Sequence, residues 1–298
     1  MSSFTKVSSS IETLPESSPL RELYPEDTYP GGAYYPSPFG RTKYWIVGPE
    51  DGQKVVLIHG IKVPALGFKS VVDALVKEGL RVLVYDLYGR GYSETPEDRP
   101  FDAHLYTFQL AFLLQYIGWS SVDVVGFSMG GAIAAAFTHL FPHLVRENVA
   151  FLAPGGMLEI GPKGPISEIP TDPESNPEAT AKAKAFADKI GDLQWSLLPG
   201  AKKAFDLSIA SGVLTALQPV YHDLGLNSKK RFIIIHGTAD KVVPYGEAVK
   251  IKRLIPQAKL VPIKGADHYL PLDAESSAQV LEELVPFLTG TEGRRYKY

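Results

Sequence analysis

Residues 122–131 of the 298-residue chain read VDVVGFSMGG, and this stretch decides the fold. Its first six residues are mostly apolar, which is typical of a buried strand. The glycine- and alanine-rich run GGAIAAAFTHLF at 130–141 has the composition of a helix that packs closely against its neighbours. Ser128 lies between the two, inside a G-x-S-x-G motif at 126–130. So tight a turn between a strand and a helix predicts a strained serine that projects at the edge of a sheet.

The alternation of strand and helix extends in both directions from this motif. Apolar runs of strand length alternate with amphipathic runs of helical period. Strands joined by helices lie parallel in one sheet with helices on its faces, so the sequence predicts an α/β fold with a mostly parallel sheet covered on both faces. The strand-like runs are 42–48, 54–59, 80–86, 122–127, 147–154, 231–237 and 258–263, and the helical runs are 68–79, 102–118, 130–141, 246–255 and 277–288.

One segment interrupts this alternation. Residues 155–230 show no buried-strand pattern, and a Gly- and Pro-rich opening leads into runs that look helical. The segment leaves from the carboxyl edge of a strand, where such sheets bind ligands, so we expect a helical cap over the site; a peripheral decoration is the alternative. The chain then divides into an irregular N-terminal arm at 1–40, a core at 41–154 and 231–298, and the cap at 155–230. The tyrosines in the second half of the arm indicate that it packs on the core.

Composition and charge exclude several functional classes. The chain contains no cysteine, which excludes disulfides, thiolate catalysis and thiolate-bound metal centres. A net charge of −3 gives no basic surplus, so we expect no nucleic-acid partner. No run approaches the ~18 apolar residues of a membrane span, and the first residues lack the apolar core of a secretory signal. We therefore expect a cytoplasmic protein without an integral membrane segment; nothing in the sequence indicates its oligomeric state.

A serine becomes a strong nucleophile only when a base removes its proton, and the chain offers seven histidines. His268 lies in the loop IKGADHYLP directly after the last strand-like run, at the edge of the sheet where Ser128 emerges. His59 and His236 end strand-like runs, and the remaining four lie on or beside helical patterns or in the cap. We therefore predict His268 as the base.

The base needs a carboxylate that fixes its tautomer and stabilises the imidazolium. Asp240 follows the strand-like run RFIIIHG and therefore points to the same edge. Glu159 could supply the carboxylate from the preceding strand, and Asp267 adjoins His268 but would point away from it. We predict Asp240, which also gives the chain order serine, aspartate, histidine.

Two backbone donors are expected to hold the oxyanion. The first is the N–H of Met129, which follows the nucleophile, and the second is the N–H of Ile61, after the turn at His59-Gly60. The run DLYGRGYS at 86–93 contains a G-x-G, but it lacks the third glycine and the helix of a dinucleotide site. We interpret its Asp86 and Arg90 as residues that fix the loops around the oxyanion hole.

Several segments together carry a family resemblance. The segments are HG at 59–60, DLYGRGYS at 86–93, GFSMGG at 126–131, HGTAD at 236–240 and GADH at 265–268. In this order they make the chain from 42 to 288 resemble the capped serine hydrolases of the α/β-hydrolase superfamily. This group includes monoacylglycerol lipases, valacyclovir-hydrolase-like esterases and the carbon–carbon bond hydrolases of aromatic degradation, and IHGI…VYDLYGRGYS is similar to fungal members. Epoxide hydrolases and haloalkane dehalogenases carry aspartate in place of Ser128, and proline iminopeptidases carry HGGPG where this chain has HGIKVP.

The resemblance and the residues together predict a serine hydrolase that cleaves a carboxylic ester or lactone through an acyl-enzyme. The chemistry requires no metal and no organic cofactor. Apolar side chains in the cap, Trp195 and Phe205 among them, predict an apolar pocket and a small apolar ester, lactone or similar carbonyl substrate. Hydrolysis of a carbon–carbon bond by the same triad is the first alternative. A non-catalytic ligand-binding homologue is the second.

Overall fold

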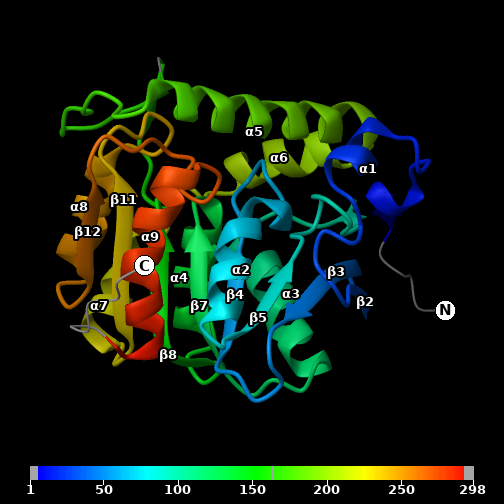
Figure 1. Cartoon of the computed structure of the whole chain (residues 1–298), viewed down its shortest axis with the longest axis horizontal. Helices are drawn as coiled ribbons and strands as arrows, with labels where there is room; N and C mark the ends of the chain where they lie inside the picture. The colour runs from blue at the N-terminus through cyan, green and yellow to red at the C-terminus, as the bar shows by residue number, and fades with distance from the viewer. Residues whose placement is uncertain (1–5, 163, 292–298) are drawn as a thin grey trace.

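A computed structural model describes residues 6–162 and 164–291. The first five residues of the predicted arm and the last seven of the predicted core lie outside the described residues. An eight-stranded sheet forms the centre of the molecule, with helices on both faces (Figure 1). From one edge to the other its strands are β12 (Lys259–Ile263), β11 (Arg231–Gly237), β8 (Val145–Leu152), β7 (Val122–Phe127), β4 (Lys54–Ile58), β5 (Arg81–Tyr85), β3 (Gly40–Val47) and β2 (Ala33–Ser37).

The predicted mostly parallel sheet is confirmed. Six strands from β12 to β5 run parallel, and β3 and β2 join antiparallel at one edge. Successive side chains of a strand point to opposite faces. Accordingly Val56 and Ile58 of β4 enter one apolar core, while Val55 and Leu57 enter the other. Apolar residues at every position of the central strands therefore stabilise both layers.

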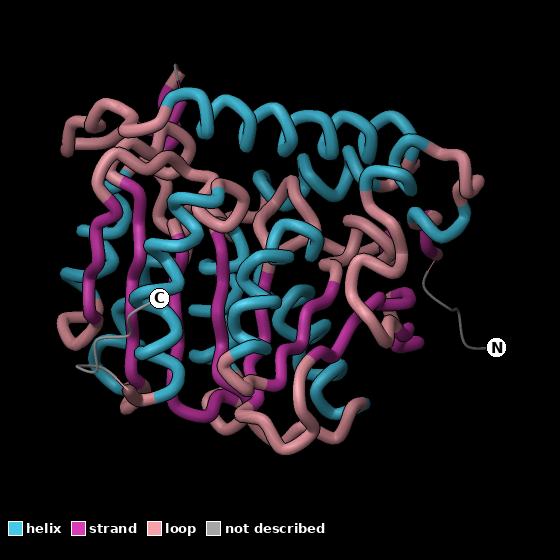
Figure 2. The backbone as a smooth tube through the Cα atoms, viewed as in Figure 1, coloured by secondary structure: helices cyan, strands magenta, loops and turns pink. Residues whose placement is uncertain are grey.

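Helices cover the two faces of the sheet in two groups (Figure 2). The first core contains side chains of α3 (Ala103–Tyr116), α4 (Met129–Leu140), α7 (Gln218–Asn227) and α8 (Tyr245–Leu254). The second contains side chains of α2 (Lys69–Lys77), preceded by the 3₁₀ turn η2 (Ala65–Phe68), and of α9 (Ala274–Thr289). Asp102 and Asp273 cap α3 and α9 by accepting backbone N–H groups, which explains where these two helices begin.

The N-terminal arm is more ordered than the sequence indicates. It contains β1 (Val7–Ser8), η1 (Ile11–Thr13), α1 (Pro19–Leu23) and the edge strand β2, and β1 pairs with β6 (Thr95–Pro96). Ile11, Leu20, Tyr24 and Tyr29 are buried in the second core. The expected packing of the arm on the core is confirmed, whereas the expected irregular conformation is wrong for these elements, because tertiary contacts order a segment without a periodic pattern of its own.

The inserted segment divides between two places. Figure 1 shows α5 (Pro177–Leu197) crossing above the carboxyl ends of the central strands, with α6 (Ala201–Ala210) beside it. The short pair β9 (Ile160–Gly161) and β10 (Gly164–Pro165) precedes them. In contrast, α7 contacts α4 and α8 on a face of the sheet. The predicted end of the cap at residue 230 is therefore too late, because α7 is a helix of the core.

Within the described residues, no helix combines the length and the apolar character that crossing a membrane requires.

Candidate active site

Ser128 stands at the turn between β7 and α4, in a conformation that few non-glycine residues adopt. Its φ is 55° and its ψ is −120°, and such backbone strain concentrates at functional sites. The glycines around it make the turn possible. A Cβ on Gly126 would lie 2.1 Å from the carbonyl oxygen of Gly130, and one on Gly130 would lie 2.0 Å from the carbonyl oxygen of Ile58. Any larger residue at either position would force the strand and the helix apart.

The hydroxyl of Ser128 is in contact with the imidazole of His268. Ser128 Oγ lies 3.0 Å from His268 Nε2, across 140 residues of chain. The histidine reaches this position from the loop after β12, and its ring packs against Phe127 with the centroids 5.1 Å apart. Ser128 is 6% exposed and His268 5% exposed. Bulk water is thus largely excluded, which strengthens polar interactions between the two groups.

Asp240 completes a chain of three hydrogen-bonded side chains. Its Oδ2 lies 2.8 Å from His268 Nδ1, and its Oδ1 accepts the backbone N–H groups of Val242 and Val243, both at 2.8 Å. Burial alone would raise the pKa of Asp240, but the imidazoles of His268 and His236 outweigh it and hold this pKa below its ordinary value. The carboxylate therefore accepts from Nδ1–H, which leaves His268 Nε2 free to accept the proton of Ser128.

The two rival carboxylates lie elsewhere. The Glu159 side chain is 64% exposed and pairs with Lys250 Nζ at 2.9 Å on the surface. The Asp267 carboxylate accepts the backbone N–H of His268, so it does not reach the imidazole with this oxygen. Neither residue is placed to orient the ring of His268.

His59 also lies at this edge of the sheet, and its two hydrogen-bond partners fix its tautomer. Its Nε2 accepts the backbone N–H of Leu87 at 2.9 Å, and its Nδ1 donates to the carbonyl of Gly60 at 2.7 Å. Both partners are backbone groups, so they fix the neutral tautomer with its proton on Nδ1. Burial lowers the pKa of His59 to about 3. His59 is therefore a neutral bridge between two loops.

The loop that follows His59 lies directly beside the nucleophile. A Cβ on Gly60 would lie 3.2 Å from Ser128 Cβ, so only glycine lets the chain pass this close. Within the described residues the backbone N–H groups of Ile61 and Met129 donate no hydrogen bond. The N–H of Met129 also opens α4, where the helix dipole favours negative charge. Both predicted oxyanion donors are thus unengaged and flank the serine.

Asp86 and Arg90 hold the surrounding loops, as the sequence indicates. The Asp86 carboxylate accepts the N–H groups of Ala65 and Tyr92 at 2.9 and 2.8 Å and the hydroxyl of Tyr24 at 3.0 Å. Arg90 Nε donates to the carbonyl of Ile61 at 3.1 Å. The loop after β5 and the loop after β4 are therefore tied together by buried charged groups.

Polar contacts also anchor the cap to these loops. The Gln194 amide donates to the carbonyl of Lys62 and accepts the N–H of Gly91, both at 2.9 Å. Lys62 Nζ pairs with Asp188 at 2.7 Å, and Arg90 donates to the Ser208 hydroxyl at 3.0 Å. Helices α5 and α6 are thereby fixed to the same loops that carry the candidate oxyanion donor.

Trp195 and Phe205 face each other in the cap. Their rings meet edge to face with centroids 4.9 Å apart, and together with Ile61 and Arg90 they line a narrow crevice between the cap and the loops. Two other apolar side chains of the insertion, Ile160 and Ile166, are 56% and 51% exposed, on β9 and just after β10. They lie on a surface hairpin, because this part of the insertion has no core to enter.

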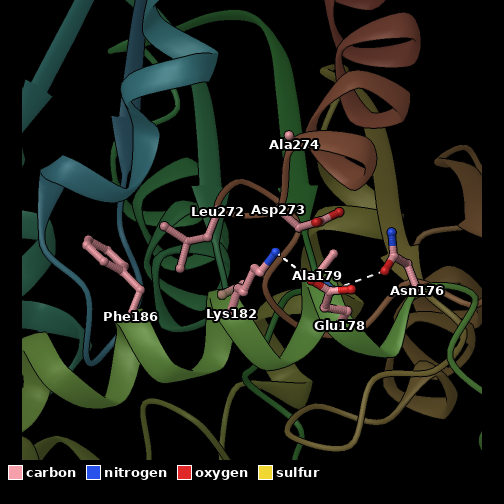
Figure 3. Close-up of a pocket in the computed structure, with 9 residues that line it drawn as sticks. Asn176, Glu178, Ala179, Lys182, Phe186, Leu272, Asp273 and Ala274 are labelled. Carbon is pink, nitrogen blue, oxygen red and sulfur yellow. Dashed lines mark hydrogen bonds and ion pairs between the residues drawn. The ribbon is translucent and has the colours of Figure 1, made fainter.

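A larger groove separates α5 from the start of α9, as Figure 3 shows. It encloses about 460 Å³, with Phe186 and Leu272 among its walls. Its polar side chains already have partners: Lys182 pairs with Glu178 at 2.7 Å, and Asp273 caps α9. The sequence gives no sign of this groove, since it arises where two distant helices meet.

His236 also contacts Asp240, although the sequence pattern gives His236 no role in the site. Its Nε2 lies 3.2 Å from Asp240 Oδ2. The available signal was its position at the end of β11, four residues before Asp240. The described residues contain no group of three or more histidines or carboxylates arranged to hold a metal ion.

Comparison with known proteins gives the family. A curated relative is the 2-hydroxy-6-oxo-2,4-heptadienoate hydrolase of Pseudomonas putida, 25% identical over 236 residues, which cover 74% of this chain and 84% of that protein. Another is the bifunctional esterase/perhydrolase of Acinetobacter calcoaceticus, 24% identical over 75% of this chain and 88% of that protein. A similar solved structure is the meta-cleavage product hydrolase of Pseudomonas fluorescens, with a TM-score of 0.68, 20% identity, and coverage of 88% of this chain and 98% of that one. A sequence model of the Alpha/beta hydrolase family matches residues 55–283, and the chain therefore belongs to that family.

Proposed function

We propose that this protein is a serine hydrolase that cleaves a carboxylic ester or lactone of an apolar substrate. The observation that carries the proposal is the continuous hydrogen-bonded chain from Ser128 Oγ through His268 to Asp240. It stands on a strained turn at the carboxyl edge of a parallel sheet, where α/β folds place their ligands. Family membership supports hydrolase activity in general.

The geometry supports an acyl-enzyme mechanism. As Ser128 Oγ bonds to the substrate carbonyl carbon, its proton passes to His268 Nε2, and Asp240 stabilises the resulting imidazolium. The bond from carbon to the alcohol oxygen then breaks, and His268 returns the proton to the leaving alcohol. Water attacks the acyl group with His268 as base, which releases the acid and restores the hydroxyl of Ser128. No step uses a metal or an organic cofactor.

The oxyanion of each tetrahedral intermediate is held by the N–H groups of Ile61 and Met129 in this proposal. Both are unengaged and lie beside Ser128, where Gly60 permits close approach. Fixed donors of this kind stabilise the developing charge without reorganising during the reaction. The crevice at Trp195 and Phe205 adjoins Ile61 but encloses only about 10 Å³, so the apolar substrate group of this proposal rests on the apolar side chains of the cap and not on an open cavity.

Hydrolysis of a carbon–carbon bond is the second candidate, favoured by a specific comparison. The curated relative named above acts, by its name, on a 2-hydroxy-6-oxo-dienoate, which carries a ketone instead of an ester. The same three side chains serve this reaction, so the site geometry fits both substrates. The esterase/perhydrolase among the relatives supports the proposal that this protein hydrolyses an ester.

Turnover of two substrates by wild type and Ser128→Ala tests the proposal. We expect wild type to hydrolyse a medium-chain p-nitrophenyl ester faster than a 2-hydroxy-6-oxo-dienoate, and Ser128→Ala to lose roughly 10³-fold or more in kcat. The reverse order of substrates would favour carbon–carbon cleavage. Labelling of Ser128 by a fluorophosphonate without turnover of either substrate would contradict the enzyme proposal in favour of a ligand-binding homologue.

A further inference from the structure

A second imidazole contacts the carboxylate of Asp240. His236 Nε2 lies 3.2 Å from Asp240 Oδ2 and 2.7 Å from the carbonyl oxygen of Val243. Asp240 Oδ2 is the same oxygen that His268 Nδ1 contacts at 2.8 Å. Both histidines and the aspartate are almost completely buried. One carboxylate oxygen therefore contacts two imidazoles, one from the end of β11 and one from the loop after β12.

The hydrogen-bonding state of His236 follows from its partners. A carbonyl oxygen only accepts, so Nε2 must carry the proton that Val243 receives. The other nitrogen, Nδ1, is buried and has no partner among the described residues. A proton there would be a buried positive charge without a hydrogen-bond acceptor, which is costly. His236 is therefore neutral, with Nε2–H directed at Val243 and Asp240.

This imidazole adds a polar contact to a carboxylate that already accepts three hydrogen bonds. Oδ1 accepts the N–H groups of Val242 and Val243, and Oδ2 accepts from His268. The Nε2–H of His236 donates to the carbonyl of Val243 and lies 3.2 Å from Oδ2, so it links the carboxylate to the turn after β11. Rotation of the carboxylate away from His268 would break these contacts.

Other titratable groups surround this arrangement. From α8, the ring of Tyr245 lies 5.9 Å from that of His236, and the charge of Glu247 interacts with His236. Burial raises the pKa of Glu247, and its Oε2 has no partner among the described residues. From the loop after β12, Asp267 and Tyr269 interact with Asp240. His236 is, however, the side chain among these that contacts the same oxygen of Asp240 as His268 does.

We propose that His236 is a positioning residue, which fixes the Asp240 carboxylate in the orientation that serves His268. This inference rests on the proposed serine-hydrolase function. The Nε2–H dipole of His236, 3.2 Å from Oδ2, also offsets part of the negative charge that would otherwise act on His268. Its removal should both loosen the carboxylate and stabilise the imidazolium of His268 in the resting enzyme.

Three variants distinguish a role of His236 in positioning Asp240 from a contribution to the stability of the fold alone. His236→Phe keeps an aromatic ring but has no donor, and His236→Gln places an amide N–H near the former Nε2. Asn227→Ala, at an exposed position at the end of α7, is a control away from the site. The readout is the rate constant for labelling by a fluorophosphonate across pH, with Tm for each variant. This rate depends on activation of Ser128 and not on the identity of the natural substrate.

We expect His236→Phe to react about tenfold more slowly, which corresponds to about 1.4 kcal/mol. The acid-side midpoint of its rate profile should move upward by about half a pH unit, because an imidazolium beside an undivided carboxylate is more stable. His236→Gln should recover most of the rate and the wild-type midpoint. Equal labelling rates and midpoints in wild type and His236→Phe would overturn the inference. An equal loss of labelling rate in His236→Phe and His236→Gln would also overturn it.

A measurement without any variant covers the case in which His236→Phe does not fold. Nitrogen NMR of the wild-type imidazoles at pH 8 should show His236 protonated on Nε2 only. A proton on Nδ1 would contradict the contact of Nε2–H with Asp240. If fluorophosphonate fails to label wild type, the proposed function itself fails; if wild type reacts and His236→Phe matches it, only the role of His236 fails.

Discussion

Asp240 illustrates how much of the candidate site depends on the direction of hydrogen bonds at single residues. Each of its oxygens accepts: Oδ1 from two backbone N–H groups, and Oδ2 from the imidazole N–H of His268. An amide of the same shape would bring an N–H of its own toward one of these donors. The size of the side chain would be preserved, and only the chemistry of the contact would change.

We therefore expect Asp240→Asn to lose about 10⁴-fold in kcat, because an amide stabilises the wrong tautomer of His268. Glu159→Gln is the matched control, since Glu159 was the rival acid and lies on the surface beside Lys250. It should keep nearly full activity. Ester hydrolysis by the two purified variants tests this prediction. A large loss in Glu159→Gln and a small one in Asp240→Asn would assign the carboxylate that orients His268 to Glu159, after the earlier strand.

His59 predicts a pH dependence of stability. Burial lowers its pKa to about 3 in the folded state, from an ordinary value of 6.5. Below pH 6.5 the unfolded chain therefore binds a proton that the folded chain does not, and stability falls as the pH falls. Its contribution is fully present above pH 6.5.

In wild type this loss amounts to about 2 kcal/mol between pH 7.5 and pH 5. His59→Gln lacks the titrating group, so the stability difference between wild type and the variant should shrink by that amount over the same range. Urea unfolding at both pH values measures it. A difference that stays constant would show that His59 does not resist protonation.

Position along the chain explains why the three candidate catalytic residues could be predicted from the sequence. The residues that contact them could not be predicted in this way. Ser128, Asp240 and His268 each follow a strand of a parallel sheet, and such strands end at one edge, so their convergence follows from order along the chain. His236 and Tyr24 act through contacts that depend on side-chain direction and on an arm without periodicity. The local sequence pattern does not predict such contacts.

At the scale of elements, the cap shows where pattern recognition fails. The sequence places all of 155–230 in the cap, but α7 packs against α4 and α8. Its Tyr221 hydroxyl donates to the carbonyl of Gly155 at 2.6 Å, which fixes α7 beneath the nucleophile turn. A helical pattern reveals an apolar face but not the surface that the face will cover.

The crevice between cap and core predicts substrate selectivity. Replacing Trp195 or Phe205 with alanine removes one half of an edge-to-face pair beside Ile61. We expect kcat/KM for long-chain esters to change relative to short-chain esters by about 1–3 kcal/mol, the usual value of a pocket methylene or two. A short activated ester should respond less, because it reaches only the triad.

Phe108→Ala is the control for this experiment. Phe108 is an aromatic residue of α3, partly exposed on the core and away from the crevice. Its removal should leave the ranking of esters unchanged. Equal losses on every substrate in the cap variants would show that Trp195 and Phe205 only hold the cap together.

At the scale of the whole molecule, the N-terminal arm is part of the core. Its tyrosines reach the loops of the candidate site: Tyr24 donates to the buried Asp86 carboxylate at 3.0 Å, and Tyr29 donates to the carbonyl of Ala65 at 2.8 Å. The arm also supplies β2, which protects the edge of the sheet beside β3. The loops of the candidate site therefore depend on residues near the beginning of the chain.

Tyr24→Phe should destabilise the protein by about 2 kcal/mol at pH 8, because it removes a donor from a buried carboxylate. Burial raises the pKa of Asp86 to about 7, so the carboxyl is mostly protonated at pH 5 and the loss should be smaller there. Tyr29→Phe removes a bond to a neutral carbonyl and should cost about 1 kcal/mol at both pH values. Urea unfolding of both variants tests this; a pH-independent loss in Tyr24→Phe would contradict the link to Asp86.

The anchoring of the cap has a consequence for engineering. Gln194, Asp188 and Ser208 each bind the loops after β4 and β5 through polar contacts. A chimera that received the cap of a relative alone would leave Lys62, Gly91 and Arg90 with foreign partners and would disturb the position of Ile61. Graft boundaries should therefore enclose 59–63 and 86–93 together with 155–217, so that the unit exchanged between homologues is discontinuous in sequence.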